Sequence, residues 1–149
     1  MLKSRSVKRI GTVAGALTSA LLLTVTQASA AAKTERATAT DGGSKNGKWE
    51  CNAYYVGDWM QARVCFDQDG DWFEIYDAPG ADGYSAVADW EIHNRWGGIF
   101  NADGAGSTRF KNKDFPEGYK LRYRACLGNW STKTIVARKC SAWETVDNN

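Results

Sequence analysis

Few residues of this chain are suited to chemistry, and the densest group is the acidic run CFDQDGDWFEIYD. Asp67, Asp69 and Asp71 in this run could bind calcium, because hard cations prefer carboxylate oxygens. In an EF-hand frame that starts at Asp67, however, the sixth position requires glycine and is Trp72, and the twelfth requires glutamate and is Ala78. The run therefore predicts a β-hairpin with QDGD at its turn, since Asp-Gly matches the twist of paired strands. An irregular calcium site at the three aspartates stays as the alternative.

His93 is the one histidine of the sequence and its one candidate for a general base. Asp89 and Glu91 precede it by two and four residues, so on a strand all three would share a face and an acid could orient the imidazole. The sequence has no motif of serine hydrolases, zinc proteases or phosphate-binding loops. We therefore predict a protein that is not an enzyme and uses no cofactor, with His93 as a hydrogen-bonded residue at the rim of a sheet.

The chain has four cysteines: Cys51, Cys65, Cys126 and Cys140. An even number of cysteines in a small exported domain indicates disulfides, and a zinc site is not expected without a C-x-x-C motif. Three pairings are possible in principle. The spacing favours Cys51 with Cys65 and Cys126 with Cys140, because both pairs are fourteen residues apart. A bridge that closes a loop of this size contributes about 3 kcal/mol to stability.

The first thirty residues have the features of a signal peptide. Basic residues at Lys3, Arg5, Lys8 and Arg9 precede the apolar run IGTVAGALTSALLLTV, and the small residues ASA follow it. This order predicts cleavage after Ala30. We expect a protein that is secreted and that has no contact with the membrane once the signal is removed.

Removal of residues 1–30 changes the charge of the protein. The chain has 19 Lys and Arg against 17 Asp and Glu, and four of the bases lie in the signal, which leaves 15 against 17. A nucleic-acid partner is therefore not expected. The remaining charge is segregated, with eleven acids between Glu50 and Asp103 and nine bases between Gly104 and Cys140.

This segregation has two interpretations. Acidic and basic strands could pair side by side and cancel, with arginine stems covering apolar surface. Alternatively, the basic half presents a face to an acidic partner. The residues of that predicted basic face are Arg122, Arg124 and Arg138.

Residues 31–48, AAKTERATATDGGSKNGK, contain no aromatic residue and no Val, Ile or Leu. This composition predicts a flexible N-terminal arm, either a spacer left by export or a segment that a partner captures as an extended strand. From Trp49 onward the apolar residues alternate, as in MQARVCF. About eight such short runs, separated by turn sequences, predict a single all-β sandwich of antiparallel strands over residues 49–149.

Seven tryptophans are many for so small a domain. Those beside Gly, Asn, Ser or a chain end are expected to be partly exposed, where indoles suit a protein interface or stacking on sugar rings; packing under loops is the alternative. The expected exposed indoles are Trp49, Trp96, Trp130 and Trp143, and Trp72 and Trp90 are expected in or near the core.

Five runs carry a resemblance to known proteins: ARVCF, DGDWFEIYD, DGYSAVADWEI, LRYRAC and RKCSAW. Over about residues 49–143 the chain resembles a group of small secreted proteins typical of Streptomyces and related actinobacteria. The group has no firmly assigned activity, so the resemblance implies the fold and export.

In size, export signal, two-disulfide β domain and N-terminal arm, the chain also resembles the small adaptor subunit of actinobacterial umbrella toxin particles. That subunit joins a lectin-bearing, trypsin-like but inactive subunit to a toxin-bearing stalk. The resemblance implies that the arm, residues 31–48, enters the cleft of the trypsin-like partner.

The predicted function is that of a secreted, non-catalytic protein-binding module. The alternatives are a carbohydrate-binding module with Trp96, Trp130 and Trp143 as its platform, and a protease inhibitor with DAPGADG as its reactive loop. The predicted partner-binding residues are Lys33, Thr34, Glu35, Arg36, Trp96, Arg122, Arg124, Trp130 and Arg138.

Overall fold

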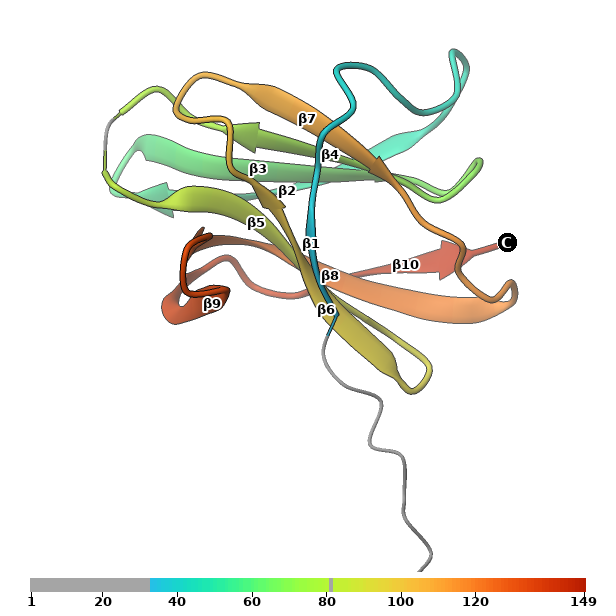
Figure 1. The fold of residues 1–149 in the computed structure, drawn as a ribbon. Coiled ribbons are helices and arrows are strands. Elements are labelled where there is room, and N and C mark those ends of the chain that lie inside the picture. Colours follow the sequence, from blue (N-terminus) through green and yellow to red (C-terminus); the bar gives the residue numbers. More distant parts are fainter. Residues whose placement is uncertain (1–32, 81) are drawn as a thin grey trace, which may run out of the picture.

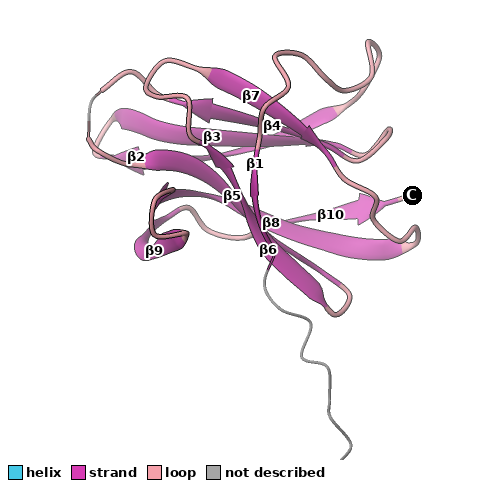
Figure 2. Cartoon of the chain, in the orientation of Figure 1, coloured by secondary structure: helices cyan, strands magenta, loops and turns pink. Residues whose placement is uncertain are grey.

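A computed structural model describes residues 33–80 and 82–149, so the predicted signal peptide at 1–30 lies outside the described residues. The described residues form ten strands and no helix (Figures 1 and 2). The strands are β1 (Lys33–Arg36), β2 (Trp49–Val56), β3 (Trp59–Asp67), β4 (Trp72–Asp77), β5 (Ser85–Ile92), β6 (Arg95–Asn101), β7 (Thr108–Asn112), β8 (Tyr119–Asn129), β9 (Thr134–Cys140) and β10 (Glu144–Asn148).

The strands form two sheets that face each other, so the predicted all-β sandwich is confirmed. One sheet has the order β2-β3-β4-β7, and the other has the order β1-β6-β5-β8-β10. The eleven-residue strand β8 pairs with β10 through its first half and with β9 through its second. All pairs are antiparallel except β1 with β6, which is parallel.

The core between the sheets follows from the alternation of apolar residues. Every second residue of β3, β4, β5 and β8 is buried, and these side chains come from both sheets. Phe66 and Phe73 pack on Tyr123 across the sandwich, with ring centroids 6.3 and 6.0 Å away. Each such buried aromatic side chain contributes about 1.5–3 kcal/mol. The core includes Trp90, as predicted.

Two disulfides join neighbouring strands, and both predicted pairings are confirmed. Cys51 on β2 is bonded to Cys65, directly opposite on β3, and Cys126 on β8 is bonded to Cys140, directly opposite on β9. Disulfides persist in oxidising compartments, so these bonds are consistent with an extracellular protein.

The predicted flexible arm is wrong for residues 33–48, which belong to the fold. Strand β1 adds a parallel strand beside β6, and Ala37, fully buried, continues this pairing through its N–H to the Phe100 carbonyl at 2.8 Å. Ala39 then bridges Phe110 on β7, at the edge of the other sheet. The chain thus ties the two sheets together: in Figure 1 it runs from β1, beside β6, up to β7 in the other sheet.

The glycine-rich part of this segment is also packed. A side chain at Gly42 would approach the Trp72 ring to 2.4 Å, so only glycine fits there. The backbone N–H of Ser44 donates to the Asp67 carboxylate at 2.7 Å. Composition suggested disorder because this segment has no large apolar side chains. It is held instead by backbone pairing, close approach and ion pairs.

The β3–β4 hairpin contains an incompletely paired carboxylate. Asp71 has a left-handed backbone (φ 56°) and is buried, with Oδ2 accepting from the Phe115 N–H at 2.8 Å. Its Oδ1 and the buried Oδ1 of Asn148 meet no hydrogen-bond partner with suitable geometry among the described residues. The nearby Asn148 side chain acts to lower the pKa of Asp71. Burial is the main reason that the pKa of Asp71 is raised.

We predict that Asp71→Asn raises the free energy of unfolding by about 1 kcal/mol at pH 7, since a buried acceptor without a donor costs about 1–3 kcal/mol. Asparagine is neutral, supplies a donor, and tolerates a positive φ. Because the folded-state pKa of Asp71 is raised, the wild-type protein loses stability as pH rises. The stabilisation by Asp71→Asn should therefore be smaller in acid, where the Asp71 carboxyl is protonated. Urea unfolding at several pH values measures it. Asp69→Asn, on the exposed part of the turn, is the control, and equal effects of both substitutions would contradict the explanation.

Candidate functional site

The β2–β3 hairpin extends beyond the rest of its sheet. Strand β4 pairs with β3 only from Asp77 opposite Ala62, so residues 55–61 have no third strand beside them. Gly57 (φ 59°) and Asp58 make the turn, and the register shifts between Tyr54 and Tyr55. The last contact from β4 is the Ala78 N–H, which donates to the Gln61 carbonyl at 3.1 Å.

This overhang exposes three large apolar side chains, which we call the hairpin tip: Tyr55, Val56 and Trp59. They are 54%, 55% and 79% exposed. They cannot reach the core because the sheet ends before them. The Cys51–Cys65 disulfide bridges the base of the same hairpin. Val56 and Trp59 lie opposite each other, whereas Tyr55 precedes Val56 on the strand and projects toward the other face. The tip is therefore an exposed apolar turn on a covalently bridged support.

The predicted basic face is largely neutralised by acidic residues of the neighbouring strand. Arg122 on β8 pairs with Glu91 on β5, and Arg124 pairs with Asp89 at 2.8 Å. Both guanidinium groups also lie over the Trp143 ring, at 4.9 and 4.3 Å from its centroid. The interpretation of acidic and basic strands that pair side by side is thus confirmed for these two arginines.

The remaining member of the basic face, Arg138, is exposed on β9. It lies apart from the paired arginines, because β9 follows the second half of β8 and Arg122 and Arg124 lie in the first half. The structure therefore does not bring the three arginines together as one cationic surface.

The predicted tryptophan platform is not assembled. Trp96 on β6 is 43% exposed, as expected, but β5 and β8 separate it from Trp143. Trp130 packs on Phe100, and the Lys133 ammonium lies 2.7 Å from its ring centroid. Cationic side chains thus lie against the rings of both Trp130 and Trp143.

The predicted arm residues are engaged within the chain. Glu35 pairs with Lys113 and lies 3.3 Å from Lys33. Arg36 pairs with Asp103. Lys33 and Thr34 are exposed on β1.

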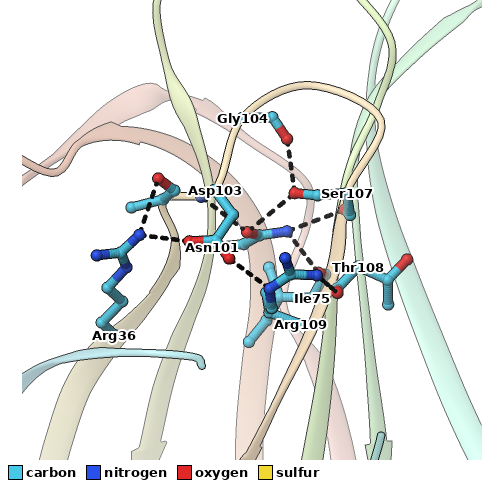
Figure 3. Close-up of polar contacts among 9 residues, drawn as sticks. Arg36, Ile75, Asn101, Asp103, Gly104, Ser107, Thr108 and Arg109 are labelled. Atoms are coloured by element: carbon cyan, nitrogen blue, oxygen red, sulfur yellow. Dashed lines mark hydrogen bonds and ion pairs between the residues drawn. The ribbon is translucent and has the colours of Figure 1, made fainter. Parts of the chain in front are cut away.

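Figure 3 shows how Arg36 takes part in a polar cluster at the β6–β7 loop. The fully buried Asn101 donates to the Ser107 carbonyl at 2.9 Å and to a β4 carbonyl at 3.0 Å, and its oxygen accepts from the Asp103 N–H and the Ser107 hydroxyl. The Asp103 carboxylate binds Arg36 and Arg109, which lower its pKa. Because these polar groups form hydrogen bonds and ion pairs with one another, the cluster has a structural role and connects the two sheets.

His93 does not meet the acids predicted to orient it. It lies at the β5–β6 turn with a left-handed backbone (φ 53°), and its ring packs on Tyr119 with centroids 4.3 Å apart. Asp89 and Glu91 are bound to arginines instead.

Asp67, Asp69 and Asp71 lie at the turn of the β3–β4 hairpin, as predicted, but their carboxylates do not converge on one point. Asp67 accepts from the backbone N–H groups of Ser44 and Asp69, whereas Asp71 faces Phe115. Within residues 33–80 and 82–149, no group of three or more His, Cys, Asp or Glu is placed to hold a metal ion. The calcium alternative therefore has no assembled ligand set in the part described.

The predicted inhibitor loop follows β4. Pro79, Gly80, Asp82 and Gly83 are exposed, and Ala81 lies outside the described residues.

Sequence reasoning missed the hairpin tip, although the signal was present: in YYVGDWM, large apolar residues flank a Gly-Asp turn.

No protein-family model, curated protein or solved structure matches this chain significantly. No helix among the described residues is long and apolar enough to cross a membrane.

Proposed function

We propose that the protein is a secreted, non-catalytic protein-binding module whose contact surface is the hairpin tip. The observation that carries this proposal is that, of the five large hydrophobic side chains exposed among the described residues, three belong to this one turn. Exposed tryptophan and tyrosine are the residue types that most often dominate the binding energy of protein interfaces.

The support of the tip favours the same proposal. A contact surface that is fixed before binding loses less conformational entropy when it meets its partner. The Cys51–Cys65 bridge and the β2–β3 ladder fix the two strands that carry the tip. The signal-like residues 1–30 and the two disulfides support action outside the cell.

The resemblance to toxin-particle adaptors suggests the kind of partner, another secreted protein of the same organism. In our proposal the contact moves from residues 31–48 to the tip. Glu35 and Arg36 are bound within the chain, and Ala37 is fully buried, so releasing this segment for capture would break the tie between the sheets.

The test is affinity capture from the culture supernatant of the native host with the mature protein as bait. Trp59→Ala should abolish capture of a partner in stoichiometric amount, because an indole that anchors an interface contributes about 2 kcal/mol or more. The matched control is Trp96→Ala, which removes an exposed indole from the other sheet and should leave capture unchanged. Equal capture by wild type and Trp59→Ala would overturn the proposal.

The exposed Trp59 ring at the tip also suits stacking on a sugar ring. Binding to insoluble chitin or cellulose distinguishes this second candidate. Retention of the wild type on either polysaccharide, lost in Trp59→Ala and kept in Trp96→Ala, would assign the tip to carbohydrate instead of protein.

A further inference from the structure

Strand β2 is an edge strand whose outer side has no backbone partner among the described residues. It is the first strand in the order β2-β3-β4-β7, and in the part described no backbone–backbone hydrogen bond outside its ladder with β3 involves it. The Glu50 carbonyl also accepts from the Tyr123 hydroxyl of the other sheet at 2.6 Å. Such an edge is a template for pairing with another chain.

The geometry at the disulfide shows which groups face outward. Cys51 and Cys65 lie opposite each other with a Cα–Cα distance of 4.0 Å. In antiparallel sheets this short distance belongs to pairs that do not exchange hydrogen bonds, whereas bonded pairs are about 5.5 Å apart. The N–H and C=O groups of Cys51 therefore point away from β3, and by the alternation of the strand so do those of Trp49 and Ala53.

The other edges of both sheets carry protection that is absent from residues 49–54 of β2, the part before its register shift. Ala39 bridges the open side of β7. Strand β1 has four residues, of which three are charged, β9 carries Arg138 and Lys139, and β10 has five residues with Glu144 and Asp147. Strand β2 has eight residues and one charge, Glu50. Short length and charge are the usual devices that keep edges from pairing.

We infer that the β2 edge binds the β2 edge of a second copy of this chain, antiparallel and about a twofold axis at Asn52. In this register Cys51 of one copy lies opposite Ala53 of the other, so the outward N–H and C=O groups of both are satisfied. Glu50 lies opposite Tyr54, which keeps the two Glu50 carboxylates apart. A closed twofold pairing uses both edges and leaves none open.

A second copy suits this edge because the twofold register places no like charges opposite each other and pairs the outward backbone groups of Cys51 with those of Ala53. Tyr55 of one copy would lie opposite Trp49 of the other and would bury part of the exposed apolar surface. Trp59 belongs to β3, one strand away from the contact, and stays available. The dimer would therefore cover Tyr55 of the hairpin tip and leave Trp59 exposed. Capture tested at Trp59 and the oligomeric state are separate measurements, so either proposal can fail without the other.

The oligomeric state of the mature protein tests this inference by sedimentation velocity over a wide range of concentrations. The wild type should be a dimer. Ala53→Pro removes an outward N–H without removing a β2–β3 ladder bond and should raise the dissociation constant about tenfold or more. Ala53→Thr keeps the N–H and should remain dimeric. A wild type that is monomeric at every concentration, or an Ala53→Pro variant that dimerises as tightly, would overturn the inference.

A charge pair at the twofold axis tests the register separately, should Ala53→Pro not fold. Asn52→Lys and Asn52→Glu each place like charges opposite each other, which destabilises paired strands. Both also remove the hydrogen bond that the Asn52 side chain donates to the Ala142 carbonyl at 2.8 Å, so Asn52→Ala is the control and should remain dimeric. Each charged variant alone should be monomeric, and a mixture should form the heterodimer, with an affinity that falls as salt rises. No recovery on mixing would exclude the twofold at Asn52.

Discussion

Glu35→Ala is expected to lower the free energy of unfolding by about 3 kcal/mol, because it leaves the buried ammonium group of Lys113 without its partner. The Lys113 side chain is 4% exposed and its Nζ lies over the Trp90 ring, 4.8 Å from the centroid. Burial raises the pKa of Glu35, but the hydrogen bond and charge of Lys113 outweigh it and hold the pKa below its usual value. The wild type should therefore lose this stability as pH falls through the folded-state pKa of Glu35. Chemical denaturation at pH 7 measures the difference.

Two further variants make the result specific. Thr34→Ala, an exposed neighbour on β1, should change the free energy of unfolding by less than about 0.5 kcal/mol. Glu35→Ala combined with Lys113→Met should recover much of the loss, since an apolar side chain can replace the ammonium over the Trp90 ring. If Glu35→Ala proved as mild as Thr34→Ala, β1 would not be part of the stable fold.

Strand β1 is the element that could not be predicted from the sequence. Strand β1 reads KTER and has no apolar face, so hydrophobic alternation cannot reveal it. Its position depends on parallel pairing with β6 and on ion pairs with Lys113 and Asp103, which are 78 and 67 residues away from their partners in the chain. Contacts of such long range leave no local pattern.

The strands and bridges that could be predicted have local causes. Alternation places Ala62, Val64 and Phe66 on one face of β3, and the core buries all three. The equal spacing of the cysteines reflects two neighbouring strand pairs in which the cysteines lie directly opposite each other. The alternation and the cysteine spacing each extend over no more than about fourteen residues, so they can be read from local sequence.

The candidate site was only partly predictable for a related reason. A tryptophan beside turn residues was expected to be exposed, and Trp96 is. Trp130 and Trp143 stand in similar local sequence, yet Lys133, Arg122 and Arg124 cover them. Trp59 is exposed because β4 ends at Asp77, and the relative lengths of neighbouring strands depend on the register of the sheet. Local sequence does not contain that register.

Asp77→Asn is expected to stabilise the protein at pH 7 by about 3 kcal/mol. Asp77 is 4% exposed at the end of β4, and burial, assisted by the charge of Asp82, raises its pKa to about 6 from 3.8. A shift of about two units corresponds to about 3 kcal/mol at 1.36 kcal/mol per unit. The backbone of Asp77 is held by two hydrogen bonds, from its N–H to the Ser107 carbonyl at 2.9 Å and from the Gly106 N–H to its carbonyl at 2.7 Å.

The pH dependence identifies the cause. Because the folded-state pKa of Asp77 is raised, the folded state binds the extra proton between about pH 4 and 6, and the wild type should lose stability as pH rises through this window. Asp77→Asn mimics the protonated side chain, so the variant and the wild type should be equally stable at pH 4 and should diverge by pH 7. Asp82→Asn removes only the secondary cause and should recover a smaller part. A gain of equal size at pH 4 and pH 7 would show that the stabilisation has another origin than the buried charge.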